Sequence, residues 1–231
     1  MKILFINETC GRGSHGKICA EMAERMEAEG HQCKIAYGRN DVPERYKKFA
    51  YLIGSKASVY THVLLTRLFD AHGMGSIKAT KKFIEWVESF QPDMVWIHNI
   101  HGYYLNVKLL FDWLKKHPEI KKNWTLHDAW AFTGHCACFN LVGCKKWEEG
   151  CSSCVQKSEY PQSIFLDRSM ANYRAKKEAF CGVNNMQLIC PSQWLADLTR
   201  KSFLSEYPVE ISYNTIDTNV FKYREIGRAH V

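Results

Sequence analysis

Long apolar runs, internal repeats and low-complexity tracts are absent from this 231-residue sequence. No stretch of 18 or more apolar residues occurs, and this excludes a conventional membrane-spanning helix. The apolar start, residues 1–7, gives way at once to a polar, glycine-rich stretch. A signal peptide needs a longer apolar region and a small-residue cleavage site. We therefore expect a cytoplasmic protein.

A basic stripe with interleaved aromatic residues is also missing, so nucleic acid is not an expected partner. The net charge is +7, but the lysines are spread along the chain in pairs. A positive charge of this kind favours anionic partners such as nucleotides or phospholipid surfaces. The alternative is an ordinary, mildly basic surface.

The hydrophobic fraction of 46% is ample for one large α/β domain. Apolar runs typical of buried strands alternate with segments whose apolar residues recur at helical spacing. The expected strands are 2–7, 33–38, 48–53, 94–98, 124–127, 186–191 and 209–214. This alternation predicts a doubly wound, mainly parallel sheet over residues 1–214, with the first strand central. The irregular, cysteine-rich stretch 129–161 is expected to be an insertion.

Three polar clusters follow expected strands. They are a glycine-rich loop at 11–16, a cluster at 98–104 and a cluster at 127–130. Ligands of doubly wound sheets bind outside the carboxyl ends of the strands, where the strand order reverses. The three clusters are therefore expected to meet at one site.

The glycine loop lets backbone N–H groups approach an anion at a helix N-terminus. No acidic residue ends the second strand, where the ribose of a dinucleotide would need one, so that ligand is disfavoured. A tight turn without a ligand is the alternative. His98, His101 and His127, with Asp128 beside the last, suit hydrogen bonding to sugar hydroxyls and acid–base chemistry. Ordinary core or surface histidines are the alternative.

Four of the ten cysteines have the spacing of a metal site. They are Cys136, Cys144, Cys151 and Cys154, and the last two form a C-x2-C knuckle. Four thiolates can close a tetrahedral structural zinc site. Free or redox-active thiols, and a disulfide, remain open alternatives.

The motifs together resemble those of bacterial family 4 glycosyltransferases, most closely the colanic-acid-type enzymes of exopolysaccharide synthesis. The resemblance covers residues 1–224 and is carried by HNIHGYYLN (98–106), TLHDAWAFTGHC (125–136) and GCKKWEEGCSSC (143–154). Near the end, NTIDTNVF (214–221) is similar to the family motif that leads into a second Rossmann-like domain, with Thr215 in place of the usual glycine.

The resemblance implies a GT-B fold, in which two Rossmann-like domains face each other across the active site. It implies retaining transfer of a hexose from a nucleoside-diphosphate sugar to a growing polysaccharide or lipid-linked oligosaccharide, without a catalytic metal. By resemblance, Gly13 and Gly16 lie near the donor diphosphate and His127 contacts the transferred sugar. His98, Tyr103 and Asp128 line the acceptor side, and we take His127 and Asp128 as the catalytic candidates. His101 is a further candidate for substrate binding.

The resemblance also implies that this chain is the N-terminal, acceptor-side half, with an interdomain linker starting at 215–224 and no donor domain. Such a chain is expected to be inactive alone, and peripheral contact with the inner face of the membrane is expected of the enzyme. Residues 225–231 are interpreted as a sequencing-adapter artefact, with a genuine polar tail as the alternative. The rival function is a non-catalytic, zinc-stabilised binding module for an anionic partner. A nucleotide-sugar epimerase or dehydrogenase is disfavoured because no acidic residue ends the second strand.

Overall fold

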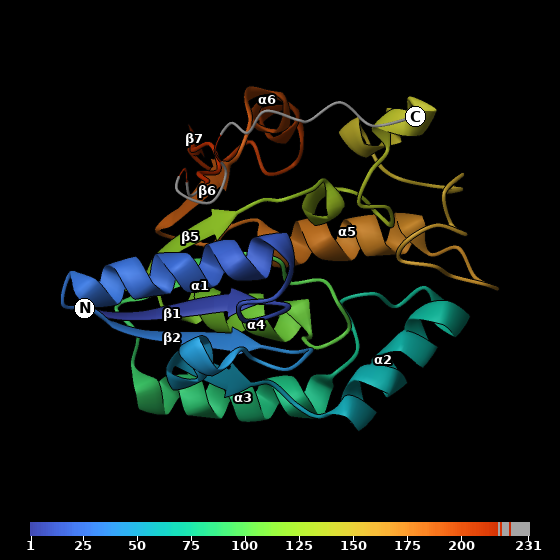
Figure 1. Cartoon of the computed structure of the whole chain (residues 1–231). Helices are drawn as coiled ribbons and strands as arrows, with labels where there is room; N and C mark the ends of the chain where they lie inside the picture. Colours follow the sequence, from blue (N-terminus) through green and yellow to red (C-terminus); the bar gives the residue numbers. More distant parts are fainter. Residues whose placement is uncertain (217, 219–221, 223–231) are drawn as a thin grey trace, which may run out of the picture.

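The computed structural model describes residues 1–216, 218 and 222. Within these residues seven strands form one sheet in the order β3-β2-β1-β4-β5-β6-β7, and all neighbouring strands are parallel (Figure 1). The strands are β1 (Lys2–Asn7), β2 (Gln32–Tyr37), β3 (Ala50–Leu52), β4 (Met94–Ile97), β5 (Lys121–Thr125), β6 (Met186–Cys190) and β7 (Val209–Ile211). The predicted parallel α/β fold is confirmed, and β1 is an interior strand with two strands on one side and four on the other.

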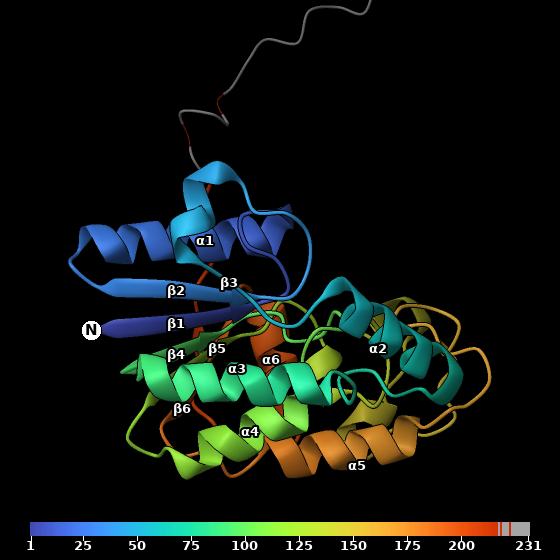
Figure 2. The same cartoon turned by 90° about the horizontal axis from the view of Figure 1, so that it is seen from below.

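Helices cover both faces of the sheet. Figure 2 shows α1 on one face and α3, α4 and α5 on the other, with α2 at one end of the molecule. The helices are α1 (Gly13–Ala28), α2 (Lys56–Phe69), α3 (Ile77–Phe90), α4 (Val107–Lys116), α5 (Ser169–Phe180) and α6 (Gln193–Lys201). Helices on both sides bury a parallel sheet on both of its faces.

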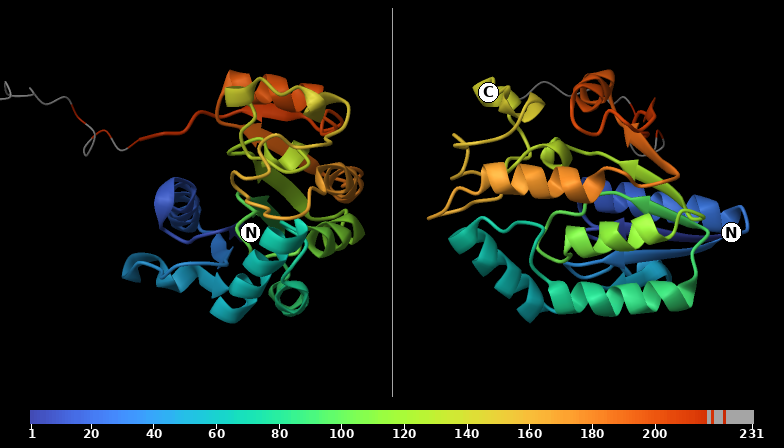
Figure 3. Two further views of the ribbon diagram at one scale, coloured as in Figure 1. Left: turned by 90° about the vertical axis from the view of Figure 1, so that its right-hand side faces the viewer. Right: turned by 180° about the vertical axis from the view of Figure 1, so that it is seen from behind.

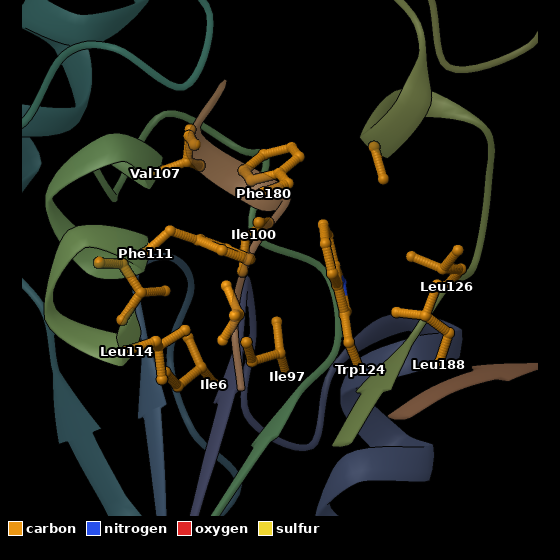
Figure 4. Packing of buried hydrophobic residues seen from close by; sticks show 14 of the residues in the cluster. Ile6, Ile97, Ile100, Val107, Phe111, Leu114, Trp124, Leu126, Phe180 and Leu188 are labelled. Carbon is orange, nitrogen blue, oxygen red and sulfur yellow. The ribbon is translucent and has the colours of Figure 1, made fainter. Parts of the chain in front are cut away.

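The core has one part on each face of the sheet. Along β1, Leu4 and Ile6 belong to the larger part, whereas Ile3 and Phe5 belong to the smaller part beneath α1. In the larger part, residues of α4 and α5 meet the strands, and Trp124 stands among them (Figure 4). Because successive side chains of a strand point to opposite faces, an unbroken apolar run is what a doubly covered strand requires.

Two strand predictions need correction. The strand predicted at 48–53 is shorter: its first two residues end a 3-10 helix, Glu44–Phe49, which buries Tyr46 and Phe49, and the strand itself is β3, Ala50–Leu52. The strand predicted at 124–127 starts earlier, at Lys121, and ends at Thr125.

The early start of β5 depends on a buried lysine. Lys122 is fully buried, and its ammonium donates to the carbonyl oxygens of His117, Ile120 and Asn184 at 2.5, 2.8 and 3.0 Å. Burial lowers the pKa of Lys122. Three carbonyl acceptors replace the water that a charged group normally keeps, so a residue typical of loops can lie inside a sheet.

The segment between β5 and α5 is irregular, as predicted. In residues 126–168, all of which are described, the helical elements are three single 3-10 turns, Trp130–Phe132, Asn140–Val142 and Lys146–Glu148. The tail 225–231 and most of the predicted linker 215–224 lie outside the described residues. None of the described helices combines the length and the apolar character that crossing a bilayer requires.

Candidate functional site

The strand order reverses between β1 and β4, which are neighbours in the sheet. From β1 the chain builds outward through β2 and β3, and from β4 it builds in the opposite direction. Connections leaving β1 and β4 therefore diverge, and their carboxyl ends border the place where ligands bind in such sheets. Asn7, His98 and His127 stand at or just after the ends of β1, β4 and β5.

His98 and His127 form a hydrogen-bonded pair at this position. Nδ1 of His98 lies 3.1 Å from Nε2 of His127, and the rings stack with centroids 5.4 Å apart. Burial lowers the pKa of His127 to about 4 and also lowers that of His98. Both imidazoles are therefore neutral at physiological pH and can exchange hydrogen bonds with a hydroxyl group without carrying charge. Among the described residues, Nε2 of His98 is buried without a partner.

His101 and Asp128 form a second pair beside the first. Nε2 of His101 lies 2.8 Å from Oδ2 of Asp128, and Oδ1 of Asp128 accepts the backbone N–H of Trp130 at 2.9 Å. Burial alone would raise the pKa of Asp128, but the charge of His101 and these hydrogen bonds hold it below its usual value. The carboxylate is therefore ionised and fixed in orientation. The clusters at 98–104 and 127–130, which were expected to meet at one site, are thus joined by two hydrogen-bonded pairs.

The hollow between the two pairs is small. His98, Asn99, His101, His127 and Asp128 line a cavity of about 20 Å³, which has room for about one water molecule. His98 also borders a groove of about 400 Å³ on the α1 side of β4–β7. The described domain on its own therefore offers a recess for one polar group together with a wider open groove.

The glycine loop leads into α1, and its two predicted glycines differ. Gly13 has φ +67°, and an added Cβ would meet no atom within 4 Å, so the space beside it is open to a ligand. Gly16 is buried, and an added Cβ would lie 2.2 Å from Oγ1 of Thr9. Gly16 is therefore needed for close packing of the loop. A ligand beside Gly16 could be contacted only by backbone N–H groups at the start of the helix.

Residues that the sequence analysis did not select connect the loop to the histidines. Oδ1 of Asn7 lies 3.2 Å from Nδ1 of His15 and accepts the backbone N–H of Asn99 at 3.1 Å. The ring of His15 lies 5.8 Å from that of His127. Asn7 stands at a strand end, so the rule that pointed to His98 could also have found it.

Glu8 and Arg39 form an ion pair next to this network. The guanidinium of Arg39 lies 3.0 Å from the carboxylate of Glu8, and it stands 5.9 Å from the ring centroid of Tyr103. Arg39 lies two residues after the end of β2, so it too stands near the carboxyl end of a strand, as Asn7 does. The pair supplies a fixed cation at the carboxyl edge of the sheet.

The sequence matches the profile of Glycosyltransferase Family 4 over residues 16–220, which is most of its length. The chain belongs to glycosyltransferase family 4. It is also similar to a protein of Escherichia coli strain K12 described as putative colanic acid biosynthesis glycosyl transferase WcaC, with 26% identity over 208 residues. That match covers 85% of this chain and 50% of the relative, so the chain spans about half the length of the curated relative it matches.

Tyr103, the remaining predicted site residue of this family 4 domain, lies beside the second pair. It has φ +69°, and its ring packs 4.7 Å from that of His72 and 6.2 Å from that of Tyr160. The Tyr160 hydroxyl lies 3.0 Å from Nδ1 of His101. Tyr160 comes from the irregular segment, about 60 residues along the chain from His101, and no pattern in the sequence signals its arrival.

The four predicted zinc ligands of the family 4 domain line one cavity of about 20 Å³. Sγ of Cys151 accepts the backbone N–H of Gly134 at 3.1 Å, and a hydrogen bond from Cys136 lowers the pKa of Cys154 to about 6. In the described part of the chain, no three Cys, His, Asp or Glu side chains are already arranged to hold a metal ion. The fit to zinc therefore depends on the shared cavity and not on preformed coordination.

A buried lysine lies between the cysteines and the site. Nζ of Lys176 donates to the carbonyl oxygens of Trp130 and Thr133 at 2.7 and 3.0 Å, and it stands 3.5 Å from the ring centroid of Trp130. Burial lowers the pKa of Lys176 to about 7. Because Trp130 follows Asp128 by two residues, the hydrogen bond from Lys176 to Trp130 holds in place the loop that carries Asp128.

Proposed function

We propose that this chain is the acceptor-side half of a GT-B glycosyltransferase. The reaction is transfer of a hexose from a nucleoside-diphosphate sugar to a growing polysaccharide or lipid-linked oligosaccharide, with retention of configuration. The similarity to WcaC supports an exopolysaccharide product. Residues 1–214 would form the first Rossmann-like domain, and a second such domain would hold the sugar nucleotide. The enzyme would act in the cytoplasm.

The observation that carries the proposal is the neutral His98–His127 pair beside the ionised Asp128, at the strand ends of a family 4 domain. His127 would bond a hydroxyl of the transferred sugar, because a neutral imidazole can donate or accept without a competing charge. Asp128, oriented by His101, would stabilise positive charge on the sugar ring or accept a proton from the acceptor hydroxyl. His98, His101 and Tyr103 would line the acceptor side.

The glycine loop would meet the donor. Gly13 begins α1, and the first-turn N–H groups of a helix carry partial positive charge without helical partners. The open space beside Gly13 would let a diphosphate approach this backbone. Charge neutralisation would come from the protein, so no catalytic metal is required by this proposal.

A structural zinc ion is also part of the proposal. Cys136, Cys144, Cys151 and Cys154 would hold it, and the support is their common cavity together with the hydrogen bond from Gly134 to the Cys151 sulfur. Sulfur ligands of structural zinc commonly accept backbone N–H groups, which stabilise the thiolate. The ion would tie the irregular segment to the loop that carries Asp128.

The test is a transfer assay on an intact enzyme that carries this domain, with a panel of nucleoside-diphosphate hexoses. Replacing His127 by Ala should lower kcat about 100-fold or more, with a small change in melting temperature. His117→Ala is the matched control, because that histidine pairs with Glu88 and Glu119 at the opposite end of the strands. Comparison of the anomeric configuration of donor and product by NMR tests retention. Equal losses of activity in both variants would contradict the assignment.

A further inference from the structure

Trp130 is enclosed by residues from distant parts of the chain. It opens the 3-10 turn Trp130–Phe132 and is buried. Its ring centroid lies 3.5 Å from Nζ of Lys176 and 5.2 Å from the centroid of the His101 ring. On another side, a Cβ added at Gly73 would lie 2.9 Å from the indole. The indole therefore has little room to move while these neighbours stay in place.

The position of Trp130 determines the direction of the Asp128 carboxylate. Oδ1 of Asp128 accepts the backbone N–H of Trp130 at 2.9 Å, while Oδ2 lies 2.8 Å from Nε2 of His101. An aspartate that bonds the backbone two residues further on forms an Asx turn, which couples the side chain to the path of the loop. A displaced Trp130 backbone would therefore turn the carboxylate relative to His101.

Lys176 fixes the backbone of Trp130 from outside the loop. Its Nζ donates to the carbonyl oxygens of Trp130 and Thr133 at 2.7 and 3.0 Å. These carbonyls stand at the end of a 3-10 turn, where backbone groups lack helical partners. Within the loop, the N–H of Thr133 reaches the Trp130 carbonyl only at 3.4 Å. The lysine therefore makes the shorter of the two bonds to this carbonyl and caps the turn from another element.

Helix α5, which carries Lys176, is firmly anchored. The right view of Figure 3 shows α5 beside the 3-10 turn, and the two elements are in contact. Near the end of α5, Phe180 is fully buried, with its ring centroid 4.5 Å from that of Phe111. Near its start, Asn172 donates to the carbonyl oxygen of Asp70 at 2.7 Å. The hydrophobic core therefore sets the place from which the lysine reaches the turn.

Lys122 provides an internal comparison. It is as deeply buried as Lys176, and it also donates to backbone carbonyl oxygens. Its acceptors lie near the amino end of β5, whereas the candidate site lies beyond the carboxyl end. A lysine with a purely structural role should behave like Lys122. The two lysines therefore separate stabilisation of the fold from orientation of Asp128.

We propose that Lys176 is a positioning residue for the transfer reaction and sets the direction of the Asp128 carboxylate through Trp130. Both carbonyl bonds need only two N–H groups, which an amine retains when it is neutral. A misplacement of about 1 Å at a reacting group can lower a rate constant about 100-fold. The effect on the reaction rests on the function proposed above, whereas the orientation of Asp128 by Lys176 does not.

Amide hydrogen exchange, measured by NMR on the purified chain, tests the orientation. The reference is the N–H of His98, which bonds within the sheet at 2.8 Å. Lys176→Met should speed exchange of the Trp130 N–H about tenfold or more relative to this reference, because the bond to the carboxylate loosens. Lys122→Met is the matched control. It should leave the ratio of the two exchange rates as it is in the parent, even if it lowers stability.

Kinetics of an intact enzyme that carries this domain test the effect on the reaction. Lys176→Met should lower kcat about tenfold or more while the KM for the donor changes less than about twofold. In an Asp128→Asn background the same substitution should lower kcat less than about twofold, because the group that it orients is already gone. Lys122→Met should leave kcat of the folded enzyme unchanged.

Three results would overturn the proposal. They are an unchanged exchange ratio in Lys176→Met, equal losses of kcat in the two lysine variants, and a full loss from Lys176→Met in the Asp128→Asn background. Circular dichroism checks folding. If the Met variant does not fold, Lys176→Gln replaces it, because its amide still offers N–H groups, and the same criteria apply. An Asp128→Asn enzyme with unchanged kcat would contradict the proposed function instead, and the exchange ratio would still decide the orientation.

Discussion

His101 and Asp128 are 2.8 Å apart between Nε2 and Oδ2, although they follow different strands of the sheet. The imidazole is held from its other side by the Tyr160 hydroxyl, and the carboxylate by the N–H of Trp130. Each group of the pair thus has a fixed orientation before any ligand binds. Preorganisation of this kind is what electrostatic catalysis requires.

Replacing Asp128 by Asn should lower kcat of an intact enzyme about 100-fold, because the negative charge beside the sugar is lost. Stability should change by about 1 kcal/mol or less, since the amide oxygen can still accept the N–H of Trp130. Steady-state kinetics and thermal melting measure the two effects. An unchanged kcat would remove Asp128 from the mechanism.

The two loop glycines should respond differently to substitution. Gly16→Ala should destabilise the domain by about 1–3 kcal/mol, because the new Cβ collides with Oγ1 of Thr9. Gly13→Ala should cost about 1–2 kcal/mol from its left-handed φ alone. Urea denaturation measures both. In a Thr9→Ala background, Gly16→Ala should lower the free energy of unfolding by less than it does in the parent, whereas the effect of Gly13→Ala should not change. If Gly16→Ala lowers the free energy of unfolding equally in both backgrounds, the collision with Thr9 is contradicted.

Acid should destabilise the domain before its carboxylates titrate. Burial lowers the pKa of His62 to about 4, whereas an unfolded histidine has a pKa of about 6.5. Between these values the unfolded chain binds more protons, so the free energy of unfolding falls as pH falls, by roughly 1.4 kcal/mol per pH unit for this residue. Burial also lowers the pKa of His72, His98 and His127, so they act in the same direction.

Melting temperatures between pH 7 and pH 5 measure this effect. The parent should lose stability steadily below about pH 6.5. His62→Gln should be less stable at pH 7 but should show a smaller loss on acidification, because one of the titrating groups is gone. A parent melting temperature that does not change over this range would show that the buried histidines titrate normally.

The cysteine cavity should retain about one zinc ion per chain on purification. Cys151→Ser should abolish retention and lower the melting temperature, whereas Cys138→Ser should do neither, because Cys138 is exposed and outside that cavity. Elemental analysis with thermal melting before and after a chelator measures both. Purified protein without metal, or equal losses in the two variants, would favour free thiols.

Much of the fold could be predicted because its signals are local. The apolar run of β1 and the helical spacing in α4 each report burial within a few residues, and alternation of the two implies a parallel sheet. The strand-end rule then placed His98 and His127 together without any knowledge of their side-chain contacts.

The rest depended on long-range contacts. Tyr160 reaches His101 from a segment without periodicity. One of the carbonyl groups that accept from the buried Lys122 belongs to Asn184, 62 residues along the chain. His72 is buried among aromatic rings and other histidines that come from four separate segments. Nothing within a short window of sequence encodes such neighbours.

The two hidden lysines give the domain a built-in chemical reporter. Lys122 and Lys176 are 0% and 1% exposed, while surface lysines such as Lys47, Lys48 and Lys81 are open to solvent. An amine-acylating reagent should modify the surface lysines within minutes and leave these two intact as long as the domain is folded. Mass spectrometry of the two peptides would then record the opening of β5 and α5 separately. Since Lys176 lies behind the Asp128 loop, its acylation would also show when that loop detaches.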